Sequence, residues 1–148
     1  MTSKPLHEDV FSELMQSCFR INRELIAAAA QLTGDTGITG AQWGVLGVFG
    51  GGPEPMTVAQ AARQLGQTRQ GVQRVADLLA TKGWLEYQQN PNHRRAKLAV
   101  VTRQGRELLD LLEDRQTDWA RKASGDFDIE DLRAATELIR RISARLTD

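Results

Sequence analysis

The period at which apolar residues recur changes at Gly83, and this change limits the folds open to the chain. Before Gly83, apolar side chains repeat at steps of three and four, which is the period of one helical face. After it, residues 84–89 and 96–101 contain aromatic and β-branched side chains and flank a turn-rich segment, residues 90–93. This pattern predicts a two-stranded hairpin. Helical periods return after Thr102, so we expect a mainly α-helical chain with one small β-hairpin.

Capping residues mark the starts of three short helices that precede the hairpin. Thr39 is followed three residues later by Gln42, and Thr57 by Gln60, so each pair matches a capping box. Thr68 supplies an N-cap for the third helix. A few residues including one glycine separate the second and third helices, which is the spacing of a helix-turn-helix. With the hairpin that follows, residues 39–102 are expected to form a winged helix-turn-helix.

The third helix and the hairpin carry side chains suited to contacts with DNA. The apolar residues of the helix fall on one side, and the other side of its first turns carries arginine and glutamine. Arginine donates two hydrogen bonds to guanine, whereas glutamine both accepts from and donates to adenine. Basic residues at the tip of a hairpin can enter the minor groove. The candidate DNA-binding residues are Thr68, Arg69, Gln70, Gln73 and Arg74 in the helix and His93, Arg94, Arg95 and Lys97 in the hairpin.

The distribution of charge favours a nucleic-acid partner, although the whole chain has a net charge of zero. Between Thr57 and Arg106 there are nine basic residues, opposed only by Asp77 and Glu86. A positive segment of this kind is typical of a surface that binds a phosphate backbone. A solvated charged surface explains the same composition, so charge alone leaves both interpretations open.

Wide apolar faces at the two ends of the chain predict self-association. In residues 5–33 the apolar stripe is broader than one small domain can bury, and residues 103–147 carry further apolar stripes in two helices. Because little else in the chain is left to cover them, we expect these segments to be dimerisation helices. The chain is therefore expected to be a single domain, residues 1–148, that forms a homodimer.

Several other function classes find no support in the sequence. No apolar run reaches the roughly 18 residues that span a membrane, and the N-terminus does not resemble a signal peptide, so we expect a cytoplasmic protein with no membrane partner. The one cysteine, Cys18, and the two histidines, His7 and His93, form no metal-ligand spacing and no nucleophile–base pair. We therefore expect no enzymatic activity, no cofactor and no metal site.

Five segments of the chain resemble the MarR (multiple antibiotic resistance regulator) family. They are TVAQAARQLG (57–66), TRQGVQR (68–74), LATKGWL (79–85), NPNHRRAK (90–97) and VTRQG (101–105). The wing and the turn that follows it are the most specific of these, and the likeness extends over nearly the whole chain. The resemblance implies a two-fold dimer of winged helices that binds an inverted repeat in double-stranded DNA. It also implies a repressor that a small aromatic ligand releases.

The resemblance further implies a role for Arg95, which falls on the family's minor-groove arginine. The acid that usually braces this arginine is replaced here by His93. A neutral imidazole forms no ion pair with arginine, so this departure implies either a looser wing or a phosphate contact that depends on pH. An inert turn residue is the third interpretation of His93.

Two more residues and one rival function stay open at this point. Relatives bind small aromatic ligands between their dimer and DNA-binding regions, and Trp43 could line such a pocket, although Trp43 is more readily interpreted as a core residue. One branch of the family senses hydroperoxides through a cysteine on its first helix, the position of Cys18. Thiols on an apolar stripe are usually inert, however. The rival function is a winged helix that docks a protein partner and does not bind DNA.

Overall fold

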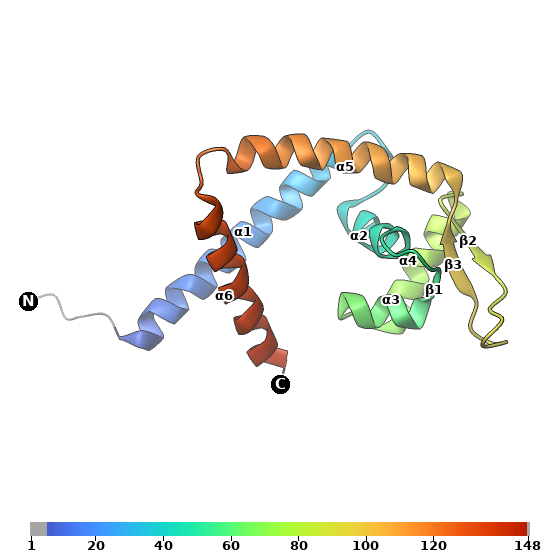
Figure 1. Ribbon diagram of the computed structural model, residues 1–148, viewed down its shortest axis with the longest axis horizontal. Helices are drawn as coiled ribbons and strands as arrows, with labels where there is room; N and C mark the ends of the chain where they lie inside the picture. Colours follow the sequence, from blue (N-terminus) through green and yellow to red (C-terminus); the bar gives the residue numbers. More distant parts are fainter. Residues whose placement is uncertain (1–5, 148) are drawn as a thin grey trace, which may run out of the picture. The chain divides into compact units, whose positions relative to one another are not determined.

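Helices dominate the computed structural model, which describes residues 6–147. The elements are α1 (His7–Thr33), α2 (Gly40–Gly50), β1 (Met56–Thr57), α3 (Val58–Leu65), α4 (Arg69–Thr81), β2 (Leu85–Gln88), β3 (Leu98–Val101), α5 (Arg103–Ser124) and α6 (Ile129–Thr147). This order confirms the expected mainly α-helical fold with a small β-hairpin. Figure 1 shows the three strands side by side next to the group formed by α2, α3 and α4.

Reciprocal capping contacts begin the short helices where the sequence predicts. The Thr39 hydroxyl accepts the backbone N–H of Gln42 at 3.2 Å, and the Gln42 side chain accepts the N–H of Thr39 at 3.1 Å. Thr57 and Gln60 make the same pair of contacts at the start of α3. Each cap satisfies N–H groups that have no partner within the helix. These contacts fix where α2 and α3 begin.

The strands form one antiparallel sheet in the order β1-β3-β2. The predicted hairpin is present, with Leu85 opposite Val101 and Gln88 opposite Leu98. Strand β1, in which Met56 pairs with Ala99 of β3, was not predicted from the sequence. A two-residue strand is too short to show an alternating pattern. Because β1 leads directly into α3, it ties the start of the helix-turn-helix to the hairpin.

One apolar core is formed by side chains of α2, α3, α4, the sheet and the first turns of α5. Its buried members are Ile38, Val45, Leu46, Phe49, Val58, Ala61, Ala62, Val72, Ala76, Leu79, Leu85, Ala99, Leu109 and Leu112. Burying one large aliphatic side chain contributes about 1.5–3 kcal/mol to folding. This core therefore holds α4 and the hairpin on a rigid base, which a surface that recognises a fixed partner requires.

The chain divides into two compact units, residues 1–113 and residues 114–148. The first contains α1 to α4, the sheet and the start of α5, and the second contains the rest of α5 and all of α6. No residue of α6 is buried. Within residues 6–147 no helix is both long enough and apolar enough to cross a membrane. The proposed single domain and the proposed dimerisation helices stay predictions at this stage.

Candidate nucleic-acid interface

Helix α4 separates a buried face from an exposed one, as the apolar pattern predicts. Val72, Ala76 and Leu79 are buried in the core. The Thr68 hydroxyl accepts the N–H of Gly71 at 3.1 Å and so caps the helix. The predicted DNA-contacting side chains Arg69, Gln70 and Arg74 are exposed. The helix therefore offers cationic and amide groups to solvent along its first two turns.

Within the part of the chain that the structure describes, the exposed arginines of α4 and of the hairpin have no anionic partner. None of the ion pairs found among residues 6–147 includes the four arginines of these two elements, which are Arg69, Arg74, Arg94 and Arg95. By contrast, Arg103 pairs with Glu107 at 3.0 Å in α5. Unpaired guanidinium groups on one surface are available to neutralise phosphates.

Two other basic residues between Thr57 and Arg106 make contacts within the protein instead. The Lys82 ammonium donates to the carbonyl of Gly37 and lies 5.0 Å from the centre of the Trp84 ring. Arg106 donates to the carbonyl of Gly50 at 3.0 Å. Counting charges along the sequence therefore overstates the number of cations that face a partner.

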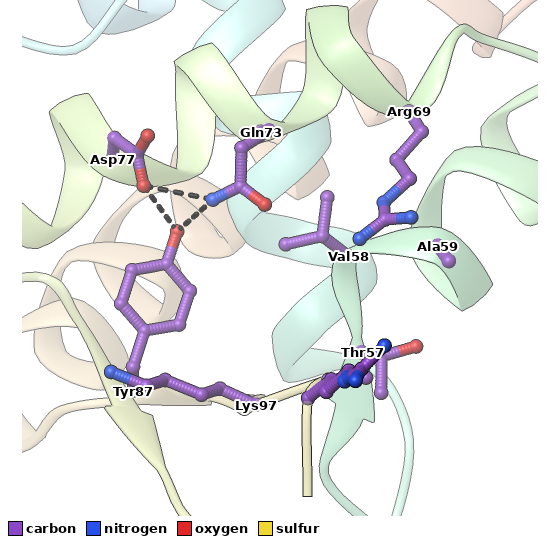
Figure 2. A pocket seen from close by; sticks show the side chains of 10 residues that line it. Thr57, Val58, Ala59, Arg69, Gln73, Asp77, Tyr87 and Lys97 are labelled. Carbon is purple, nitrogen blue, oxygen red and sulfur yellow. Dashed lines mark hydrogen bonds between the residues drawn. The ribbon is translucent and has the colours of Figure 1, made fainter. Parts of the chain in front are cut away.

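A concave surface brings α3, α4 and the hairpin together (Figure 2). This pocket has a volume of about 320 Å³ and is lined by Thr57, Val58, Ala59, Arg69, Gln73, Asp77, Tyr87, Arg95, Ala96 and Lys97. An adjoining depression is lined by Arg69, Gln70, Gln73, Arg74 and Asp77. Four of the five predicted helix residues and two of the four predicted hairpin residues thus share one surface, whereas Thr68 lines neither depression. His93 and Arg94 are exposed at the hairpin tip and line neither depression.

Three side chains on this surface form a closed hydrogen-bonded triangle (Figure 2). The Gln73 amide nitrogen donates to Asp77 Oδ1 at 2.9 Å and to the Tyr87 hydroxyl at 2.9 Å. The Tyr87 hydroxyl donates to Asp77 Oδ1 at 2.7 Å. These contacts join α4 to β2 and leave Gln73 half-buried. The sequence analysis selected Gln73 but missed Tyr87 and Asp77, and only the four-residue spacing from Gln73 to Asp77 on one helix was a usable signal.

The environment of Tyr87 disfavours its ionised form. Partial burial and the hydrogen bond to the Asp77 carboxylate raise the pKa of Tyr87 above its usual value of about 10. A raised pKa means that the folded chain keeps the proton where the unfolded chain loses it. Stability from this group is therefore complete below about pH 10 and falls as the pH rises further.

We predict that the phenol resists ionisation in the folded protein. Since Tyr87 is the only tyrosine in the chain, phenolate absorbance reports on this residue alone. At about pH 10.5 the ionised fraction should be clearly smaller in the native protein than in the urea-unfolded chain. Asp77→Ala should bring the two fractions closer together. Equal fractions in the native and unfolded wild type would contradict the network.

Trp43 and Cys18, the two residues considered as sensors of a ligand or an oxidant, are both half-buried. Trp43 is half-buried on α2 and packs against the apolar core. Cys18 is a half-buried free thiol on α1. In the part of the chain that the structure describes, no cluster of histidine, cysteine, aspartate or glutamate residues is arranged to hold a metal ion. The roles of Trp43 and Cys18 therefore stay predictions.

The chain is similar in sequence to known proteins over the region that contains this surface. The family model described as "MarR family" matches residues 36–96, which include α2 to α4 and β2 but end before β3. An uncharacterized protein of Mycobacterium tuberculosis is 34% identical over 138 residues, a match covering 93% of this chain and 95% of the relative. A Mycobacterium bovis protein matches to the same extent.

Solved structures share the fold at low sequence identity. A MarR family transcription regulator superposes with a TM-score of 0.84 at 21% identity, over 95% of this chain and 93% of that one. BldR, a transcriptional regulator from Sulfolobus solfataricus, gives 0.80 at 20% identity, over 95% and 99% of the two chains. CouR from Rhodococcus jostii, solved with p-coumaroyl-CoA bound, gives 0.77 at 20% identity over 95% of each chain.

Proposed function

The chain belongs to the MarR family of winged-helix transcription regulators, and we propose that it acts by sequence-specific binding of double-stranded DNA rather than by catalysis. In this proposal α4 lies in the major groove and the hairpin lies in the adjacent minor groove. Helix α4 carries Arg69, Gln70, Gln73 and Arg74, and the hairpin carries His93, Arg94, Arg95 and Lys97. A regulator of this kind works where the chromosome is, so we place it in the cytoplasm.

One observation carries the proposal: Arg69 and Arg74 of α4 and Arg95 of the hairpin line one surface, and none of them is paired with a carboxylate of residues 6–147. Unpaired guanidinium groups there can contact phosphates without first leaving a carboxylate, whereas paired ones would have to separate. The N-terminus of α4 adds unpaired N–H groups that favour a phosphate nearby. A surface built only to dock a neutral protein would have no need of this arrangement.

We also propose that the active form is a homodimer. In α1 the exposed apolar side chains include Phe19, Ile21 and Ile26, and in α6 they include Ile129 and Ile139. Exposed large apolar side chains in such numbers are typical of association surfaces in soluble proteins. A two-fold dimer would bind an inverted repeat whose half-sites lie about 10 base pairs apart.

Salt dependence tests whether the surface binds DNA. Because bound cations release counterions, affinity for a duplex should fall by about a thousand-fold or more between 50 and 200 mM salt. Fluorescence anisotropy with a labelled duplex measures this slope. Weak binding that ignores salt would contradict the proposal and favour a winged helix that docks a protein.

Arg95→Ala tests the place of the hairpin. We expect the largest loss of affinity on sites with A·T-rich flanks, where a narrow minor groove attracts arginine. Arg121→Ala is the matched control, because Arg121 is already paired with Asp118 at 2.9 Å. If Arg95→Ala and Arg121→Ala bind such sites equally well, the minor-groove assignment fails.

We propose further that the protein is a repressor released by a small aromatic ligand. CouR, which shares the fold, was solved with p-coumaroyl-CoA, a thioester of an aromatic acid. A ligand relieves repression only if it favours a dimer whose two α4 helices no longer match the groove spacing. Trp43 is our candidate for contacting such a ligand, and loss of ligand response in Trp43→Ala with intact DNA binding would support that role.

A further inference from the structure

The atoms of the Gln73–Asp77–Tyr87 triangle can be assigned from chemistry alone. An ionised carboxylate only accepts hydrogen bonds, so both atoms that contact Asp77 Oδ1 must donate. The Gln73 atom at 2.9 Å from this oxygen is therefore the amide nitrogen and not the carbonyl oxygen. The Tyr87 hydroxyl donates its one hydrogen to the same oxygen at 2.7 Å. Its oxygen is then left to accept from Gln73, as observed at 2.9 Å.

This assignment leaves the carbonyl oxygen of the Gln73 side chain without a hydrogen-bond donor among residues 6–147. The amide nitrogen, which carries two hydrogens, donates to two oxygens within the protein. The carbonyl oxygen accepts none of the hydrogen bonds found among residues 6–147, and Figure 2 shows it pointing away from Asp77 and Tyr87. Gln73 also lines the depression that it shares with Arg69 and Arg74. The oxygen is thus the part of the amide that a bound partner can meet.

We propose that Asp77 and Tyr87 lock Gln73 so that it presents only a hydrogen-bond acceptor to the major groove. This inference rests on the proposed function, because it assumes that α4 contacts base edges. A free glutamine pairs with adenine through both its acceptor and its donor. The locked glutamine lacks the donor, so it accepts from the exocyclic amine of adenine or cytosine and excludes guanine and thymine, which offer a carbonyl oxygen there.

Tyr87 and Asp77 act in this proposal as positioning residues and do not touch DNA themselves. The contact to the carboxylate is charge-assisted and is stronger than a bond between neutral groups. The neutral phenol that completes the triangle persists across the physiological pH range. The base preference of Gln73 is therefore a property of three side chains from two elements.

Selection of bound sequences from random duplex DNA tests the proposal with the full-length protein. The wild type should prefer adenine or cytosine at one position of each half-site, with guanine and thymine bound about five-fold more weakly or worse. In Tyr87→Phe one amide hydrogen is released, so the preference should narrow toward adenine alone. Asp77→Ala changes an exposed residue and should shift the preference in the same direction. Gln73→Ala should lose any preference at that position.

Gln116→Ala is the matched control, because Gln116 is an exposed amide on α5, outside the proposed interface. It should leave the preference at the Gln73 position unchanged. Thermal unfolding of each variant establishes that it is folded, and a loss of stability alone would weaken all sequences equally. An unchanged preference in both Tyr87→Phe and Asp77→Ala would overturn the proposal.

The dependence of DNA affinity on salt concentration, measured for the wild type and each variant, distinguishes failure of this inference from failure of the proposed function. Salt-sensitive binding without a preference for adenine or cytosine in the wild type would overturn the locked-glutamine proposal alone. Binding that is absent or independent of salt in the wild type would overturn the proposed function and this inference with it. Equal salt slopes for wild type and Tyr87→Phe are expected, because the number of phosphates contacted stays the same.

Discussion

Replacing Gly105 with alanine is expected to lower the free energy of unfolding by about 3 kcal/mol or more. Gly105 is buried in the first turn of α5, where a Cβ would overlap the carbonyl oxygen of Trp84 and come within 2.9 Å of Val101 Cγ1. The Trp84 carbonyl is held in place because it accepts the N–H of Thr102 at 3.1 Å. Alanine favours a helix by about 1 kcal/mol over glycine, so the overlap has to outweigh that gain.

A matched glycine in α2 isolates the effect of the overlap. Gly44 is exposed, and a Cβ there would meet nothing within 4 Å. Gly44→Ala should therefore stabilise the protein by about 0.5–1 kcal/mol, opposite in sign to Gly105→Ala. Urea denaturation followed by circular dichroism at one protein concentration measures both. If Gly105→Ala proves as stable as Gly44→Ala, the first turn of α5 does not pack tightly against Trp84 and Val101.

The sequence predicted the helix starts because the contacts that set them are local. Each capping box joins residues three apart, so Thr39 with Gln42 and Thr57 with Gln60 could be recognised without the fold. The exposed side of α4 followed from its apolar period for the same reason. In these places the chemistry and the spacing appear together in one short segment of sequence.

The parts that sequence reasoning missed depend on contacts between distant segments. Met56 becomes a strand residue only because Ala99 lies opposite it. Tyr87 reaches Gln73 because β2 packs beside α4, a placement that the whole core determines. Arg106 is drawn to the carbonyl of Gly50 in the same way. No period or local spacing indicates such contacts, which is why the sequence pointed to Gln73 without indicating its hydrogen bonds to Asp77 and Tyr87.

Replacing Ile139 with glutamate is expected to convert the proposed homodimer to a monomer and to weaken DNA binding by about a hundred-fold or more. Ile139 lies on α6 with 51% of its surface exposed in the single chain, so the carboxylate costs little before association. At the proposed interface the same carboxylate would lose contact with water, which is strongly unfavourable for a charge. Sedimentation or light scattering gives the mass, and anisotropy gives the affinity for a duplex containing both half-sites.

Ala144→Glu is the control for this prediction, because it places the same charge on the other side of α6. Ala144 lies five residues beyond Ile139, which turns its side chain well away from the apolar stripe. Ala144→Glu should therefore remain dimeric and bind the operator nearly as tightly as the wild type. If Ile139→Glu stays dimeric as well, α6 does not form the interface. A monomeric Ile139→Glu that keeps full affinity would instead show that a single α4 and its hairpin supply the binding energy, because the second half-site would then contribute nothing.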